Sequence, residues 1–147
     1  MYKNILLTID LANLDGERRA VDTVVEYARA FGAQLHILTV VPDFGMSIVG
    51  SFFPPEHEKR AVETANEQLH AFTRTAIPVD IRHRHIVDHG VIYRVILHYT
   101  RETQCDLVVM SSGRPDLEDY ILGPNAARVM RHARCSVLVV RDDGEAH

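Results

Sequence analysis

Short apolar runs alternate along the chain with longer segments whose apolar residues recur at helical spacing, and this alternation restricts the fold more than any other feature. The runs cover residues 5–9, 35–41, 79–87, 107–110 and 137–140. Apolar runs of this length are typical of strands covered on both faces. Because crossovers between parallel strands are right-handed, the order predicts a single doubly wound α/β domain, with a five-stranded parallel sheet and helices on both faces.

The segments between the runs place their apolar residues on one helical face. The first predicted helix carries Val21, Val24 and Ala28 and ends near Gly32, a residue typical of helix C-termini. Further helices are predicted over about 56–76, after Gly90, and around residues 126–133. Residues 43–55 contain two glycines and two prolines and predict a long surface loop. Charged residues alternate through the third apolar run, so we expect that strand at an edge of the sheet.

Composition and charge favour one globular domain over residues 1–147. Hydrophobic residues make up 46% of the chain, enough for a large core without disulfides. The 16 basic and 20 acidic residues give a net charge of −4, which offers no general attraction to nucleic acid or an anionic membrane. No uncharged run approaches the length of a membrane span, and Asp10 interrupts the N-terminal apolar run before it could serve as a signal peptide. We therefore expect a cytoplasmic protein, with Cys105 and Cys135 as reduced thiols.

Three predicted strands end in residues suited to a ligand site. In a doubly wound sheet, ligands lie beyond the carboxyl ends of the strands, where the strand order reverses. The three ends are Thr8, Ile9 and Asp10; Thr39, Val40 and Val41; and residues 109–114, which include Met110, Ser111, Gly113 and Arg114. The backbone around Val40, with its apolar side chains, suits a flat ring such as adenine.

The connection between the fourth strand and the last helix has features of a phosphate site. Gly113 and Gly123 allow the backbone to approach a ligand closely, and the helix begins directly afterwards. Pro124 fits the first helical position but lacks an N–H, which leaves the amides of Asn125 and Ala126 as donors. The same residues would also suit a plain helix start, because the loop matches no stringent phosphate-binding motif.

Two charged side chains at these strand ends have more than one interpretation. Arg114 could contact a phosphate, or it could be solvated. Asp10 could hold Mg²⁺ or a ribose hydroxyl, or it could cap the following turn. His83 and His85 alternate with arginines, which argues against a metal site there. No nucleophile motif occurs in the sequence, so no catalytic residue is predicted.

The C-terminal third of the chain closely resembles the universal stress protein family. The residues that carry this resemblance are 114–116, 120–127, 131–133 and 136–141, and the opening residues 1–10 and the segment 38–42 also match. The resemblance is strongest to the F and G branch of the family and covers the whole chain.

The resemblance implies a cytoplasmic α/β protein, commonly dimeric and induced under stress. Many members bind ATP through a pattern of Gly, two residues, Gly, nine residues, Gly and then Ser or Thr. Here Gly113 and Gly123 fit the later part of the pattern, while Met110 or Ser111 stands at the first Gly and Pro124 at the Ser or Thr. Met110 would crowd the approach of the ribose and phosphates, and Pro124 removes a hydroxyl and an amide, so each replacement is expected to weaken binding.

The resemblance therefore implies an adenine-nucleotide-binding protein that acts by nucleotide-dependent association with partners. A nucleotide-free interaction protein and a slow ATPase that uses Asp10 to place Mg²⁺ are the alternatives. Val137, Leu138, Val139 and Val140 form the predicted last strand, through which two copies are expected to pair as a homodimer. The alternative is an edge covered by the C-terminal tail.

Overall fold

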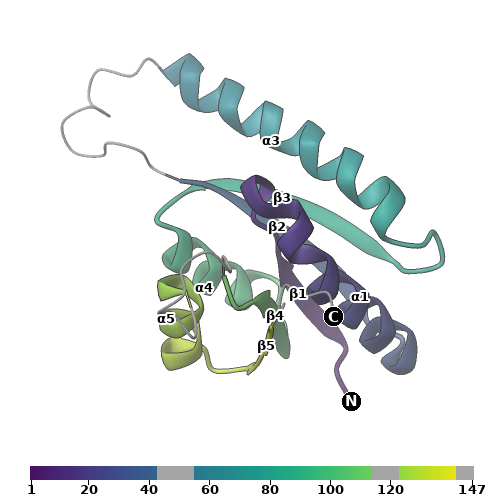
Figure 1. The fold of residues 1–147 in the computed structure, drawn as a ribbon. Coiled ribbons are helices and arrows are strands. Elements are labelled where there is room, and N and C mark those ends of the chain that lie inside the picture. Colours follow the sequence, from purple (N-terminus) through teal and green to yellow (C-terminus); the bar gives the residue numbers. More distant parts are fainter. Residues whose placement is uncertain (43–54, 114–122, 142–147) are drawn as a thin grey trace.

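A computed structural model describes residues 1–42, 55–113 and 123–141 (Figure 1). The elements are β1 (Asn4–Thr8), the 3-10 turn η1 (Leu11–Asn13), α1 (Leu14–Phe31), β2 (Gln34–Pro42), α3 (Pro55–Ala76), β3 (His83–Gly90), α4 (Ile92–Glu102), β4 (Leu107–Ser111), α5 (Pro124–His132) and β5 (Ser136–Val140). Of the loop expected over 43–55, residues 43–54 lie outside the described ranges, and Pro55 begins α3.

The five strands form one parallel sheet in the order β3-β2-β1-β4-β5, which confirms the predicted fold class. Ile5 of β1 pairs with Leu35 on one side and Leu107 on the other. The chain builds outward from β1 to β3 and then returns to place β4 on the opposite side of β1. The strand order therefore reverses between β1 and β4, at the position expected for a ligand site.

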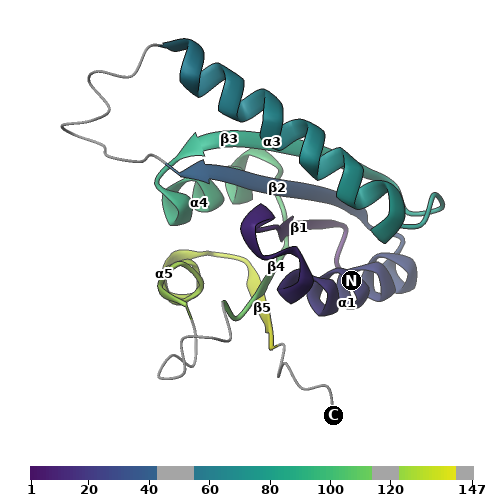
Figure 2. The ribbon, with the colours of Figure 1, turned by 45° about the horizontal axis from the view of Figure 1, so that its top comes forward.

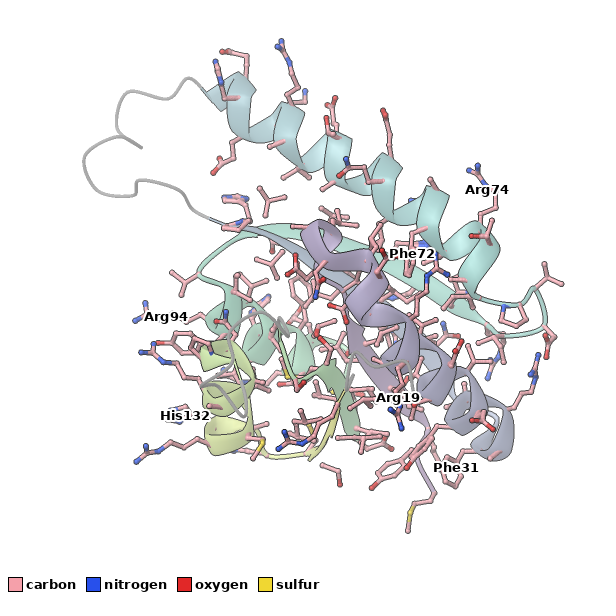
Figure 3. The ribbon with its side chains drawn as sticks, in the orientation of Figure 1. Arg19, Phe31, Phe72, Arg74, Arg94 and His132 are labelled. Atoms are coloured by element: carbon pink, nitrogen blue, oxygen red, sulfur yellow. The ribbon has the colours of Figure 1, made fainter. Side chains whose placement is uncertain are left out.

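Helices cover both faces of the sheet, as Figures 1 and 2 show. Ile5 and Leu7 of β1 pack into a core cluster with α1 and α3, and Figure 3 shows Phe72 of α3 on the side facing α1. Leu6, between them in sequence, packs into the opposite cluster with Ile96 of α4 and Val129 of α5. Alternation along a fully buried strand therefore divides the core into two layers.

Local sequence determines where several elements end. α1 ends at Gly32, which has a left-handed backbone with φ 64°, as the sequence predicted. α5 begins with Pro124 in its first turn, where the missing N–H has no partner inside the helix.

The predicted start of the third strand was wrong. Strand β3 begins at His83 and not at Val79, and it ends at Gly90 and not near Val87. The amide of Ile81 donates to the carbonyl of Pro78 at 3.1 Å, which closes a turn, and Val79 is fully exposed on it. The edge position of this strand is confirmed.

Two other features bear on the sequence expectations. Cys105 and Cys135 are both free thiols, the first buried and the second partly buried. Within residues 1–42, 55–113 and 123–141, no helix has the length and apolar character needed to cross a membrane.

Candidate functional site

A cavity of about 980 Å³ opens at the carboxyl ends of β1, β2 and β4, and α3 and the start of α5 complete its walls. Its volume is at the upper end of the range of small-molecule sites, about 300–1,000 Å³. The described site residues predicted from the sequence all line it: Thr8, Ile9, Asp10, Val40, Met110, Ser111, Gly113, Gly123, Pro124, Asn125 and Ala126. Arg114 lies outside the described residues.

Strand β2 extends past the end of β1 and presents its backbone at the cavity. The last bond between them runs from the Ile9 amide to the Leu38 carbonyl at 2.8 Å, and the Thr39 hydroxyl donates to the Ile9 carbonyl at 2.7 Å. Backbone groups alternate between the two sides of a parallel strand, so the N–H and C=O of Val40 point to the same side as those of Leu38. The register ends with Thr8 opposite Leu38, so these two groups of Val40 face the cavity beyond the end of β1.

A close backbone approach holds the two predicted phosphate-binding segments together. The Gly123 amide donates to the Ser112 carbonyl at 2.7 Å. Gly113 has φ 117°, and a Cβ there would lie 3.3 Å from the backbone N and Cα of Gly123. Both the conformation and the close contact therefore favour glycine at this position. The first turn of α5 follows at once, and the amides of Asn125 and Ala126 lie in the part of a helix where N–H groups have no intrahelical partner.

Asp10 caps the turn that follows β1. Its Oδ1 accepts a hydrogen bond from the Ala12 amide at 2.9 Å, which makes it the N-cap of η1. The side chain also lines the cavity. Among the described residues, no three His, Cys, Asp or Glu side chains are grouped closely enough to hold a metal ion. Magnesium at Asp10 therefore stays a prediction, and the remaining ligands of the ion would have to come from groups other than such side chains.

Met110 lies at the base of the cavity without filling it. Its side chain is 5% exposed and packs in the core cluster that contains Leu6, Leu38 and Ile96. An unbranched thioether adapts readily to such a core position. Most of the Met110 side chain therefore lies in the core, while the residue still lines the cavity, and its effect on a nucleotide stays a prediction.

The sequence analysis missed Glu17, a buried carboxyl group at the edge of the cavity. Glu17 is 3% exposed and its Oε2 accepts the Asp10 amide at 2.8 Å, while Oε1 has no hydrogen-bond partner among the described residues. Burial raises its pKa from 4.5 to about 7, although the bond from Asp10 and the nearby Ser111 hydroxyl oppose this. The sequence did indicate that Glu17 could be buried, because it lies on the same helical face as Val21, Val24 and Ala28.

A polar stripe on α3 was also missed. His57, Arg60, Thr64 and Gln68 line the cavity at intervals of three or four residues. This spacing places them on one side of the helix. Thr64 and Gln68 directly precede the buried residues Ala65 and Leu69 in sequence, so helical periodicity could have identified the stripe once a neighbouring site was assumed.

The histidines of β3 lie away from this cavity. His85 packs against His70 of α3 with ring centroids 3.8 Å apart, and its Nε2 is 2.7 Å from the Thr73 hydroxyl. Burial, followed by the charges of His70 and His83, lowers the pKa of His85 to about 4. His89 instead pairs with Glu58 of α3 at 2.9 Å. Their contacts join β3 to α3.

Comparison with known proteins gives consistent matches over the whole chain. The family model for Usp, the universal stress protein family, matches residues 1–141. Universal stress protein G of Escherichia coli O157:H7 is 28% identical over 143 residues, which cover 96% of this chain and all of that protein. The solved structure of hypothetical protein MJ0577 has a TM-score of 0.83 at 21% identity and covers 99% of both chains. A universal stress protein solved in complex with cAMP has a TM-score of 0.58 at 24% identity and covers 95% of this chain and 97% of that one.

Proposed function

Because the chain belongs to the universal stress protein family, we propose that it binds ATP or a related adenine nucleotide in the strand-end cavity and associates with partners in the stress response according to the nucleotide bound. One observation carries this proposal: the ends of β1, β2 and β4 and the start of α5 surround a single cavity large enough for a nucleotide. The complex of a structurally similar stress protein with cAMP supports an adenine nucleotide as the ligand class.

The two ends of the cavity suit the two ends of a nucleotide. At β2, the N–H and C=O of Val40 provide one donor and one acceptor, which match the edge of an adenine ring. At α5, the amides of Asn125 and Ala126 and the positive end of the helix dipole would stabilise phosphate oxygens. Pro124 contributes no amide, so the phosphates have one donor fewer than a helix with another residue at this position would offer.

Asp10 and a divalent cation have a secondary place in this proposal. Asp10 already accepts the Ala12 amide through Oδ1. Magnesium, if it accompanies the nucleotide, would bring phosphate oxygens as ligands, because Mg²⁺ is commonly held by one or two carboxylates together with phosphates. Asp10 would be the carboxylate ligand. This role requires no catalytic residue.

The proposal extends to assembly and location. Among the strands of residues 1–42, 55–113 and 123–141, β5 lies at an edge of the sheet and pairs only with β4, and its four apolar residues after Ser136 are half-buried. We propose that two copies pair through this edge as a homodimer in the cytoplasm. Light scattering at micromolar protein should give the mass of two chains. The mass of one chain would contradict the dimer and would leave the nucleotide site untouched.

The nucleotide proposal is tested by calorimetric titration with ATP, with and without Mg²⁺, for the natural chain and two matched variants. Asn125→Asp adds a negative charge at the phosphate end while favouring the helix start, so we expect ATP affinity to fall on the order of tenfold. Adenosine, which lacks phosphates, should bind the natural chain and Asn125→Asp with the same affinity. Asn66→Asp makes the same change on α3, where residue 66 does not line the cavity, and should leave ATP binding unchanged.

Absence of ATP binding at millimolar nucleotide would refute the proposal and favour a nucleotide-free interaction protein. Equal weakening by both Asp variants would show a general charge effect and refute the assignment of the phosphate end to α5. A separate phosphate-release assay distinguishes binding from slow hydrolysis.

A further inference from the structure

Two free thiols lie side by side, each just before the start of one of the two strands β4 and β5. Cys105 precedes β4 and Cys135 precedes β5, and their Sγ atoms are 3.9 Å apart. The strands pair with Leu107 opposite Ser136, and the Ser136 amide donates to the Asp106 carbonyl at 3.3 Å. The sheet therefore holds the two segments together. The sulfurs of a disulfide are about 2 Å apart, so a bond here requires them to approach by about 2 Å, a movement on the scale of side-chain rotation.

The two thiols differ in access to solvent. Cys105 is 8% exposed, and burial, with a smaller contribution from neighbouring Cys135, raises its pKa to about 12. Cys135 is only partly buried, and both cysteines line a surface cavity. The thiolate is the nucleophile in disulfide exchange. Cys135 is therefore the thiol that an external reagent can reach, and Cys105 is placed to react with Cys135 afterwards.

The cavity beside Cys135 is basic. It has a volume of about 710 Å³, and its lining includes Arg101, His132 and Arg134 together with the two cysteines and four uncharged residues. Figure 3 marks His132 at the end of α5. None of the described residues that line this cavity is acidic. Asp106, which does not line the cavity, makes a small contribution to the raised pKa of Cys105, and its carboxylate accepts the Lys3 and Asn4 amides. Cations at this position favour an anionic reagent.

We propose that Cys135 and Cys105 form a redox-active dithiol that reacts with a small anionic disulfide bound by Arg101, His132 and Arg134. The inference is independent of the nucleotide site, because its cavity shares no lining residue with the strand-end cavity. Two cysteines thirty positions apart match no redox motif, so only the pairing of β4 with β5 brings them together.

The reaction has two exchange steps. The Cys135 thiolate attacks one sulfur of the reagent R–S–S–R, a bond forms between Cys135 and S–R, and the leaving R–S⁻ takes up the proton that Cys135 released. Cys105 then loses its proton and attacks the Cys135 sulfur, and the second R–S⁻ leaves as R–SH. The protein dithiol is oxidised by two electrons and the reagent is reduced to two thiols. The first step also removes the Cys135 thiol and its charge, which contribute to the raised pKa of Cys105.

The test treats fully reduced protein with oxidised glutathione, blocks remaining thiols and measures intact mass. The natural chain should lose two hydrogen atoms within one chain. Cys105→Ser should stop with one glutathione on Cys135, and Cys135→Ser should react at least about tenfold more slowly, because Cys105 is buried. Circular dichroism confirms that both variants are folded. The proposal is wrong if the natural chain keeps both thiols, if it stops at the glutathione adduct, or if Cys135→Ser reacts as fast as the natural chain.

Recognition of the anion is tested separately. Oxidised glutathione carries net negative charge and cystamine carries positive charge, so the ratio of their initial rates reports on the charge of the cavity. Arg134→Gln should reduce that ratio by about two- to fivefold at low salt, the range for one exposed ion pair, and added salt should reduce it further. Arg74→Gln, on α3 and outside this cavity, is the matched control. A ratio unaffected by Arg134→Gln and by salt would overturn the basic binding site.

Discussion

Replacing the buried Glu17 by Gln should change how the stability of the protein depends on pH. The carboxyl is 3% exposed and its pKa is raised from 4.5 to about 7 in the folded state. Between these two values the folded chain binds more protons at this group than the unfolded chain does. Stability therefore falls as pH rises through this window, and the cost is complete above about pH 7. Gln has nearly the same shape and does not ionise.

The magnitude follows from the size of the shift. One pKa unit corresponds to 1.36 kcal/mol, so a rise from 4.5 to about 7 amounts to about 3 kcal/mol at high pH. Roughly 2–3 kcal/mol of this develops between about pH 5 and pH 8. The natural chain should therefore lose that much stability relative to Glu17→Gln over this interval. The comparison cancels the titration of groups common to both proteins and any fixed cost of the amide.

The assay is urea unfolding of both proteins at several pH values from about 5 to 8. The unfolding free energy of Glu17→Gln minus that of the natural chain is plotted against pH. We expect a curve that rises and then levels near pH 7. A difference that stays flat would refute the reasoning, because it would mean that burial does not suppress ionisation of Glu17. A difference of the opposite slope would mean that the carboxylate is stabilised in the folded state.

Three further changes test the backbone and the packing around the site. Gly113→Ala should lower the unfolding free energy by about 1–3 kcal/mol, because φ at this position is 117°. Gly123→Ala has an ordinary φ and room for a Cβ, so it should change stability by less than about 1 kcal/mol. Equal unfolding midpoints for the two variants would contradict this. Thr39→Val leaves the Ile9 carbonyl without its hydroxyl donor and should cost about 1–3 kcal/mol in urea unfolding, and an unchanged midpoint would count against that bond. The pKa of His85 is lowered to about 4, so the folded state resists its protonation and stability should fall as pH drops below about 6.5. His85→Gln should therefore lose less stability than the natural chain between about pH 7 and pH 5. Melting temperatures that shift equally in the two proteins would argue against this contribution.

The sequence predicted features that depend on local pattern. The apolar runs located the strands, Gly32 and Pro124 located helix ends, and the strand ends identified the described residues that now line one cavity. Val79 was misplaced because its β-branched side chain favours a strand, while the turn closed by Pro78 and Ile81 leaves it exposed.

Features that depend on tertiary packing could not be predicted in the same way. Glu17 lies in the acidic first turn of α1, where a carboxylate is ordinarily exposed, and the packing of α1 against β1 and β4 buries it. The contact between Cys105 and Cys135 depends on the pairing of β4 with β5. The polar residues of α3 face a site because the first part of that helix lines the same cavity as the strand ends. In each case the missing information was which surfaces meet.

A single residue after β4 joins the cavity to the outer edge of the sheet. The Ser112 amide donates to the Val140 carbonyl at 3.0 Å, and the Ser112 carbonyl accepts the Gly123 amide at 2.7 Å. A ligand that displaced the start of α5 would therefore stretch a hydrogen bond to the same residue that anchors the last position of β5. Ligand binding in the cavity would then be coupled to the position of β5, the edge strand proposed to pair with a second copy. The coupling would pass through two backbone hydrogen bonds of Ser112 and would not require either hydrophobic layer to rearrange.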